Sequence, residues 1–306
     1  MRLACVRWSK NTIWEMHIMD RILITAATGH TGNATAKLLL ERGLSVRALV
    51  RKEDERSREL VRLGAEIVTG NLRDFDSIRP AMKDVSRAYF VFPIGPGLIE
   101  STAYFAQAAV DAGIEAIVNM SQISAREDAK SHVAQDHWLA ERLLDRTGIA
   151  TTHLRPTFFA EWFLYYPAMI KSGVIRFPFR RGRHAPIAVS DQARVIAAIL
   201  QNPEPHKGMT YELFGAVEMD HSEIARQIGI ALGKPMHYEA VTFDEFAEAA
   251  STRLAENEIR TQHLREVAVD YENGIFSGMN QVVEQVGGLP PTDIQTFIRA
   301  HRSLFE

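Results

Sequence analysis

Cysteine is almost absent from this 306-residue sequence. Cys5 is the only one, so the chain can form neither an internal disulfide nor a zinc site built from cysteine thiolates. Proteins without disulfides are typical of reducing compartments. We therefore expect a cytoplasmic protein.

An excess of charge of one sign and long hydrophobic runs are also missing. Lysine and arginine number 35 against 38 acidic residues, so the formal net charge is only −3. Such a chain has no overall field that attracts nucleic acid or an anionic membrane. No apolar run approaches the roughly 20 residues that span a bilayer. We expect a small-molecule substrate, no nucleic-acid or membrane partner, and a monomer or homodimer.

Several catalytic motifs are missing as well. The sequence contains no Gly-x-Ser-x-Gly elbow, no Walker-type phosphate loop and no His-Glu-x-x-His helix. His132 and His137 are five positions apart, which does not place them on one helix face. We therefore expect no metal site.

The most informative stretch runs from residue 21 to residue 43. Apolar, β-branched residues at 22–25 predict a buried strand, and residues 34–42 have the apolar spacing of a helix that stops at Gly43. A strand, a glycine turn and a helix in this order are typical of a dinucleotide site, because the N–H groups of the helix N-terminus bind the diphosphate.

The glycine turn departs from the usual spacing. Gly29 and Gly32 fit the second and third glycines of G-x-x-G-x-x-G, but Ala26 occupies the first position. The alternative is a tight turn that binds nothing, and the methyl group of Ala26 favours it. The residues expected to bind the cofactor here are Thr28, Gly29, His30, Thr31 and Gly32.

Strands and helices alternate through the first half of the chain. Further strands are predicted at 44–50, 65–70, 88–92, 116–120 and 150–154, with helices between them. This alternation predicts an α/β fold, a Rossmann-type doubly wound parallel sheet with a ligand crevice at the carboxyl ends of its strands. The expected division is a Rossmann domain at 20–156 that binds NADP(H) and a smaller, mostly helical, mainly substrate-binding C-terminal region at 157–306. Residues 186–215 are expected to return to the Rossmann domain, and 1–19 to be an N-terminal extension outside the fold.

The end of the second predicted strand indicates which dinucleotide binds. An acidic residue there would favour NAD(H), but the strand ends in Arg51 and Lys52. A guanidinium matches a 2′-phosphate well, so we expect NADP(H) to be preferred over NAD(H), with Arg51 as the first contact and Lys52 or Arg47 in support. The alternative is a solvated basic strand end neutralised by Glu53 and Asp54.

The other strand ends supply the remaining candidates. Asn71 is able to bind the adenine edge, or to form an Asx turn that precedes the next helix. The Ser121 hydroxyl is expected to reach substrate or nicotinamide, and His137 to act as an acid or hydrogen-bond donor, unless it is structural. The further expected cofactor contacts are Leu72, Phe92, Pro93, Ile94, Met120, Pro156, Thr157 and Phe158. The expected substrate pocket is formed by Phe159, Trp162 and Tyr165, although some of these aromatics are expected to be interdomain core.

Four stretches resemble one family. They are Ile24–Gly32, Gly148–Phe159, Pro186–Ala193 with Gly208–Leu213, and Ile224–Pro235. Together they resemble the NmrA-like proteins, a branch of the atypical short-chain dehydrogenase/reductases, from about Asp20 to the C-terminus. The resemblance implies a Rossmann domain, a small C-terminal domain and NADP(H) binding. Ala26, and Asn71 where an aspartate is common, depart from the family pattern.

The family includes NADPH-dependent quinone and dye reductases and also redox-sensing regulators. The stretch 136–141 looks most like the quinone and triphenylmethane reductases, which also lack the Tyr-x-x-x-Lys pair of other short-chain reductases. No tyrosine occurs between Ser124 and Leu144. We expect an NADPH-dependent oxidoreductase that transfers hydride to a quinone-like or other flat, electron-poor molecule. The alternative is a non-catalytic NADP(H)-binding redox sensor.

Overall fold

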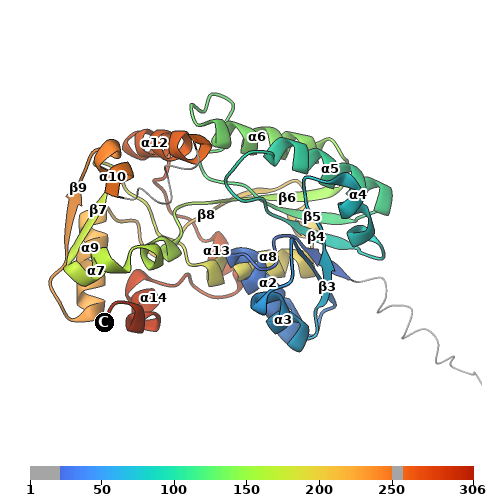
Figure 1. The fold of residues 1–306 in the computed structure, drawn as a ribbon, viewed down its shortest axis with the longest axis horizontal. Coiled ribbons are helices and arrows are strands. Elements are labelled where there is room, and N and C mark those ends of the chain that lie inside the picture. The colour runs from blue at the N-terminus through green and yellow to red at the C-terminus, as the bar shows by residue number, and fades with distance from the viewer. Residues whose placement is uncertain (1–20, 250–257) are drawn as a thin grey trace, which may run out of the picture.

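A parallel sheet forms the centre of the computed structural model, which describes residues 21–249 and 258–306. The expected extension at 1–19 lies outside the described residues. The sheet has seven strands in the order β3-β2-β1-β4-β5-β6-β8. Figure 1 shows helices on both of its sides. In chain order they are β1 (Ile22–Ile24), β2 (Val46–Val50), β3 (Glu66–Thr69), β4 (Arg87–Phe90), β5 (Ala116–Met120), β6 (Ala150–Pro156) and β8 (Thr210–Leu213).

Helices cover both faces of the sheet because the strands are apolar on both sides. Ile22 and Ile24 pack in one core with Leu39, whereas Leu23 between them packs in another with Phe105. The first face carries α2 (His30–Glu41), α3 (Glu55–Arg62) and α8 (Val189–Gln201), and the second carries α4 (Phe75–Ile78), η1 (Arg79–Met82), α5 (Leu98–Ala112) and α6 (His132–Asp145). The predicted Rossmann-type α/β fold is confirmed.

The strand order reverses beside β1. Its neighbour on one side is β2, the next strand in the chain, and on the other side β4. The connections from β1 and from β3 therefore leave in opposite directions. In parallel sheets of this kind, ligands bind outside the carboxyl ends of the strands beside such a point.

The C-terminal region is largely helical, as predicted, but it also contains a small sheet. β7 (Val174–Phe177) pairs in parallel with β9 (His237–Ala240). Neither strand was predicted from the sequence. The helices are η2 (Ala160–Tyr165), α7 (Pro167–Ser172), η3 (Glu204–His206), α9 (His221–Leu232), α10 (Phe243–Ala249), α12 (Glu258–Glu272), α13 (Val282–Gly287), α14 (Ile294–Ala300) and η4 (Arg302–Leu304). The sequence also predicts a helix over 243–255, which begins at Phe243 as predicted. The last part of this prediction lies outside the described residues.

A buried aromatic cluster forms the core of this region. At its centre the Tyr271 hydroxyl donates to the Gly182 carbonyl at 3.0 Å and lies 2.9 Å from His221 Nδ1 and 3.3 Å from His184 Nδ1. Burial lowers the pKa of His221 to about 3 and that of His184 well below its usual value. Both imidazoles are therefore neutral at pH 7. The rings around them are Phe158, Trp162, Phe177, Phe179, Tyr238 and Phe276.

Candidate functional site

The expected site residues meet at one edge of the sheet. Strand pairs such as Val50 with Thr69, Phe90 with Asn119, and Met120 with Leu154 lie side by side near the carboxyl ends. The segments that follow these strands therefore share one edge, beside the point where the strand order reverses.

The glycine turn holds α2 close against the end of β1. Gly29 N–H donates to the Ala26 carbonyl at 2.7 Å, and a Cβ on Gly32 would lie only 2.5 Å from the same oxygen. Ala26 itself has φ +45°, the left-handed conformation that favours glycine. Tyr89 fixes the start of the helix, because its buried hydroxyl donates to Thr31 Oγ1 at 2.8 Å.

The N-terminus of α2 suits an anion. Gly29 is its N-cap, and no side chain of the described residues accepts from the first-turn N–H groups. The first turn, His30–Asn33, contains no carboxylate that would repel a phosphate. Free N–H groups and the positive end of the helix dipole bind phosphate groups at such positions.

Unpartnered donors lie at the ends of β5 and β6. The hydroxyls of Ser121 and Thr157 and Nε2 of Gln122 are buried and have no hydrogen-bond partner in the part of the chain that the structure describes. Gln122 Oε1 already accepts from the Ser124 hydroxyl at 2.9 Å, so the amide nitrogen is the available end. Buried donors without partners are costly. A ligand with carbonyl or amide groups would satisfy them.

The basic residues after β2 are available for a phosphate. Arg51 and Lys52 are exposed, and within 21–249 and 258–306 no ion pair involves either side chain. Glu53 and Asp54 were the alternative partners. Neither pairs with Arg51 or Lys52 in the described ranges, and the Asp54 carboxylate caps α3 and pairs with Arg56.

Arg56 is a candidate that the sequence analysis missed. Its Nη1 donates to the Thr28 carbonyl of the glycine turn at 2.9 Å, so the guanidinium lies between the turn and α3. The sequence could have indicated its position, because an N-cap at Asp54 places Arg56 in the first turn of the following helix.

The supporting role expected for Arg47 is wrong. Its buried side chain donates to the carbonyls of Ala81 and Lys83 and pairs with Glu66 at 3.0 Å. Arg47 precedes the carboxyl end of β2 and ties the strand to η1.

The remaining cofactor candidates have mixed environments. Asn71 Oδ1 accepts from Arg73 N–H at 3.1 Å, which is the Asx turn that was the alternative for this residue.

The other predicted cofactor contacts differ in burial. Leu72 and Phe92 are half-buried against the second face of the sheet, whereas Pro93 and Ile94 are exposed. Met120 and Pro156 are buried.

His137 lies in a closed environment on α6. Only 6% of it is exposed, and burial lowers its pKa to about 4. It faces His263 of α12, whose pKa burial lowers to about 3. Ser131 caps α6 and hydrogen bonds His263 Nδ1 at 2.7 Å. This environment favours the structural interpretation of His137, because an imidazole that is neutral at pH 7 is not an imidazolium acid there.

The aromatic residues expected to hold substrate separate into different places. Phe159 packs against the sheet core, Trp162 lies in the aromatic cluster, and Phe158 stacks on Phe276 with ring centroids 4.4 Å apart. Tyr165 is exposed and its hydroxyl lies 2.6 Å from His30 Nε2. For Phe159 and Trp162 this arrangement favours the interdomain-core interpretation.

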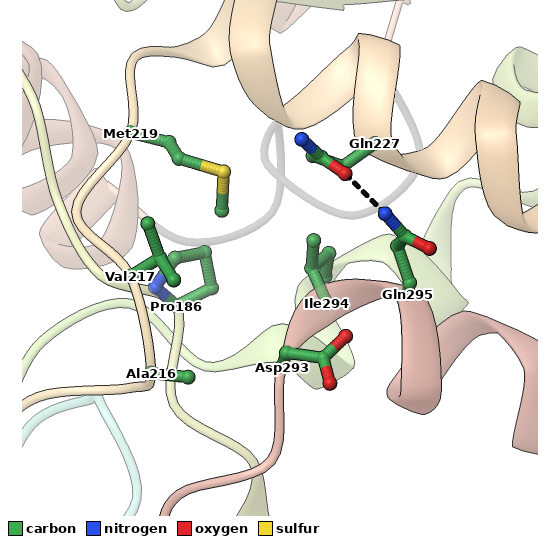
Figure 2. A pocket seen from close by; sticks show the side chains of 8 residues that line it. All are labelled: Pro186, Ala216, Val217, Met219, Gln227, Asp293, Ile294 and Gln295. Carbon is green, nitrogen blue, oxygen red and sulfur yellow. Dashed lines mark hydrogen bonds between the residues drawn. The ribbon is translucent and has the colours of Figure 1, made fainter.

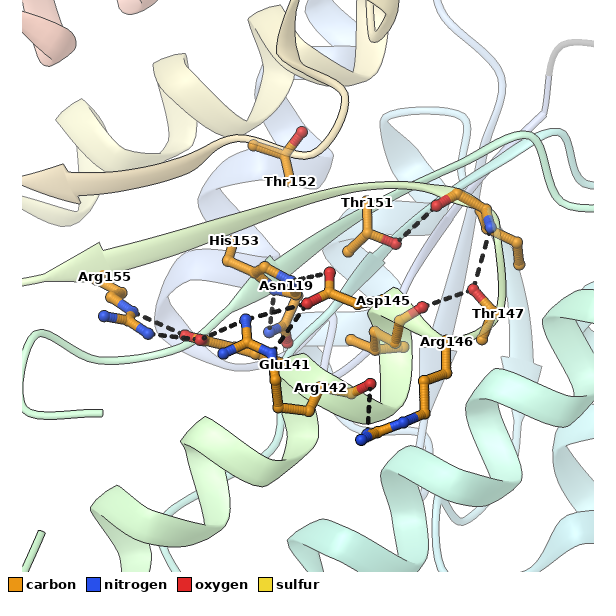
Figure 3. Close-up of polar contacts among 12 residues, drawn as sticks. Asn119, Glu141, Arg142, Asp145, Arg146, Thr147, Thr151, Thr152, His153 and Arg155 are labelled. Carbon is orange, nitrogen blue, oxygen red and sulfur yellow. Dashed lines mark hydrogen bonds and ion pairs between the residues drawn. The ribbon is translucent and has the colours of Figure 1, made fainter. Parts of the chain in front are cut away.

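Buried polar contacts hold the end of β6 against α6 (Figure 3). Glu141 is fully buried and accepts two hydrogen bonds from Arg155, at 2.8 and 2.6 Å. Beside this pair, His153 lies between Asp145 at 2.9 Å and Asn119 at 3.0 Å. These contacts position Pro156–Phe158 at the sheet edge.

A separate cavity of about 190 Å³ lies between α9 and α14 (Figure 2). Its polar side chains already have partners, because Gln227 bonds Gln295 and Asp293 binds Thr296. The lining contains none of the expected site residues. This cavity therefore does not compete with the sheet edge as the candidate site.

The model of the NmrA-like family matches residues 19–293. This chain belongs to the NmrA-like family. A relative of this NmrA-like chain, the NAD(P)H azoreductase of Xenophilus azovorans, is 28% identical over 287 residues, which are 93% of this chain and 99% of that protein.

Solved structures of other proteins share the NmrA-like fold. The NADPH-dependent quinone oxidoreductase QOR2 of Escherichia coli, complexed with NADPH, has a TM-score of 0.80 at 23% identity, covering 92% of this chain and 99% of its own. The negative transcriptional regulator NmrA, in complex with NADP, has a TM-score of 0.77 at 14% identity, covering 92% and 94%. At these identities the likeness concerns the fold. In this NmrA-like chain, none of the described helices is long and apolar enough to cross a membrane.

Proposed function

We propose that this protein is an NADPH-dependent oxidoreductase that transfers hydride to a quinone-like or other flat, electron-poor small molecule. The observation that carries the proposal is the group of buried, unpartnered donors of Ser121, Gln122 and Thr157 beside a glycine turn whose helix N-terminus is open to an anion. The similarity to an azoreductase over nearly all of both chains supports the same class of reaction.

The chain would hold the dinucleotide along the sheet edge. The first turn of α2 would bind the diphosphate, and Arg51 and Lys52 the 2′-phosphate. Ser121 and Thr157 would hydrogen bond the nicotinamide end. When bound, the cofactor supplies the hydride.

The substrate class follows from the missing proton donor. A quinone that accepts hydride becomes a weakly basic phenolate, which takes its proton from water. The neutral, buried His137 and the missing Tyr-x-x-x-Lys pair are therefore compatible with turnover. An aliphatic ketone would form a strongly basic alkoxide and would need an acid at this place.

The test is turnover. Purified protein is mixed with NADPH and a panel of quinones and azo dyes, and absorbance at the NADPH band is followed. We expect NADPH to be consumed with at least one member of the panel. The variants Ser121→Ala and Thr157→Val are each expected to lose this consumption. Tight NADPH binding without consumption across the panel would contradict the proposal.

The second candidate is a non-catalytic redox sensor that binds NADP(H). It is favoured by the same buried, neutral His137 and by the fold shared with the regulator NmrA. For a sensor we expect NADPH and NADP⁺ to bind with different affinities and to alter the proteolysis of the C-terminal region, with no consumption of NADPH.

A further inference from the structure

One contact joins the glycine turn to the C-terminal region. The hydroxyl of Tyr165 lies 2.6 Å from His30 Nε2, and the two rings meet edge to face with centroids 5.9 Å apart. His30 is the first residue of α2, and Tyr165 is the last residue of η2. The two residues are 135 positions apart in the chain.

Tyr165 projects from a segment that is fixed at its other end. Ala160 N–H donates to the Ile187 carbonyl at 2.9 Å, and Glu161 Oε1 accepts from Val189 N–H at 2.9 Å. Trp162 packs against Phe179 in the aromatic cluster. The start of η2, the segment that carries Tyr165, is therefore anchored to the core of the C-terminal region.

The Tyr165 hydroxyl contacts the ring of His30, and the backbone of His30 begins α2. The proposed function places the diphosphate of the cofactor at this helix N-terminus, where the first-turn N–H groups have no side-chain cap among the described residues. A phosphate oxygen is a stronger acceptor than an imidazole nitrogen, because it is charged. His30 is the first residue of α2, so the phenol that contacts its ring lies at the same end of this helix as the expected diphosphate.

We propose that Tyr165 is a cofactor-binding residue that donates a hydrogen bond to the diphosphate from the C-terminal region. This inference rests on the proposed function and changes the role expected for Tyr165 from substrate pocket to cofactor site. It also makes the cofactor a bridge between the two parts of the protein. NADPH would then hold η2 and the aromatic cluster against the glycine turn.

The experiment uses full-length protein and the variant Tyr165→Phe. NADPH binding is titrated by fluorescence, and adenosine 2′-monophosphate, which lacks the diphosphate, is measured by displacement of NADPH. Loss of a charge-assisted hydrogen bond is expected to raise the Kd for NADPH about tenfold and to leave the Kd for the fragment unchanged.

A matched control exists elsewhere in the chain. Tyr211 and His206 form the same kind of pair, with a hydrogen bond of 3.0 Å and ring centroids 5.8 Å apart, at the amino end of β8. Tyr211→Phe removes an equivalent hydroxyl far from the carboxyl edge. It is expected to bind NADPH like the wild type.

Each outcome decides between the proposals. An unchanged Kd for NADPH in Tyr165→Phe overturns the assignment of Tyr165 and leaves the proposed function intact. An equal loss of NADPH and of the fragment also overturns it, because the effect would then act through the shape of the crevice. Failure of the wild type to bind NADPH overturns the proposed function itself.

Discussion

Ala26 occupies the position of the glycine turn at which the family pattern has its first glycine. Its backbone adopts the left-handed conformation that the expected glycine would supply, and its carbonyl accepts from Gly29 N–H. An alanine in this conformation costs about 1 kcal/mol. The turn therefore forms at the expense of strain, and the substitution does not by itself close the site.

Replacing Ala26 with glycine is expected to stabilise the protein. The relief of strain exceeds the extra entropy of the unfolded chain, so Ala26→Gly should raise the free energy of unfolding by about 0.5 kcal/mol. Chemical denaturation measures the change. Ala27→Gly is the control in the same turn, and it should lower stability because Ala27 is fully buried and has no positive φ.

Arg51 is expected to determine the preference for NADPH. Arg51→Ala removes a guanidinium that is free to bind the 2′-phosphate, so the Kd for NADPH should rise about tenfold while that for NADH stays constant. Fluorescence titration with both nucleotides measures this. Arg58→Ala removes an exposed arginine that pairs with Glu55 on the outer part of α3, and it serves as the control. Equal weakening of both nucleotides would argue against a 2′-phosphate contact.

The local sequence pattern predicted the residues of the glycine turn better than it predicted the contacts of single side chains. Gly29 and Gly32 could be identified because the turn depends only on backbone geometry. The support expected from Arg47 was wrong, because the sequence does not reveal that carbonyls of η1 bind its side chain. For His137 the sequence left a catalytic and a structural role open, because it does not reveal the contact with His263 of α12.

At the scale of elements, α6 and β6 are joined by a buried ion pair. Glu141 is fully buried, and its hydrogen bonds raise the pKa of Arg155. A buried carboxylate is tolerated when it is paired, and removal of one partner leaves the other without compensation.

Glu141→Gln should therefore weaken the whole domain. We expect the free energy of unfolding to fall by about 3 kcal/mol, since a buried pair is broken. Thermal denaturation and chemical unfolding measure it. Glu55→Gln, which removes an exposed carboxylate from α3, should leave the melting temperature unchanged. A result in which both variants melt alike would show that the Glu141 pair does not stabilise the fold.

Elements with regular periodicity were predicted, and those defined by their partners were not. β5 matches the strand predicted at 116–120, and α9 matches the helix that the apolar spacing of 221–232 predicts, because each buries a continuous apolar run or stripe. β7 and β9 have four residues each and pair only with each other across 59 intervening residues, 178–236. No local pattern indicates such a pairing. For α12 the contacts are also distant, such as the two hydrogen bonds between Arg126 and Asp270 at 2.9 and 2.6 Å.

For the whole molecule, the buried histidines predict sensitivity to acid. The pKa values of His137, His221 and His263 are lowered to about 4, 3 and 3, against an ordinary value of 6.5. The folded state thus favours the neutral imidazole. Its stability is complete above pH 6.5 and decreases as the pH falls through 6.5, where the unfolded chain takes up protons.

Chemical denaturation at pH 7.5 and pH 5.0 tests this expectation. The free energy of unfolding should drop by about 2 kcal/mol for each histidine that stays neutral in the folded state. His237→Gln removes an exposed histidine and should keep the same pH dependence. Equal stability at the two pH values would mean that the buried imidazoles take up protons without unfolding.

The last helices have a consequence for how the chain is made. α13 packs on α8, and Val283 belongs to the same core as the apolar residues under the first face of the sheet. A ribosome releases the N-terminal strands long before this helix. The nascent chain therefore carries an uncovered apolar surface on α8 until the final segment emerges. Premature termination before Val282 would leave that apolar surface permanently exposed. Such a product would be recognised by chaperones and proteases, because they bind exposed apolar segments.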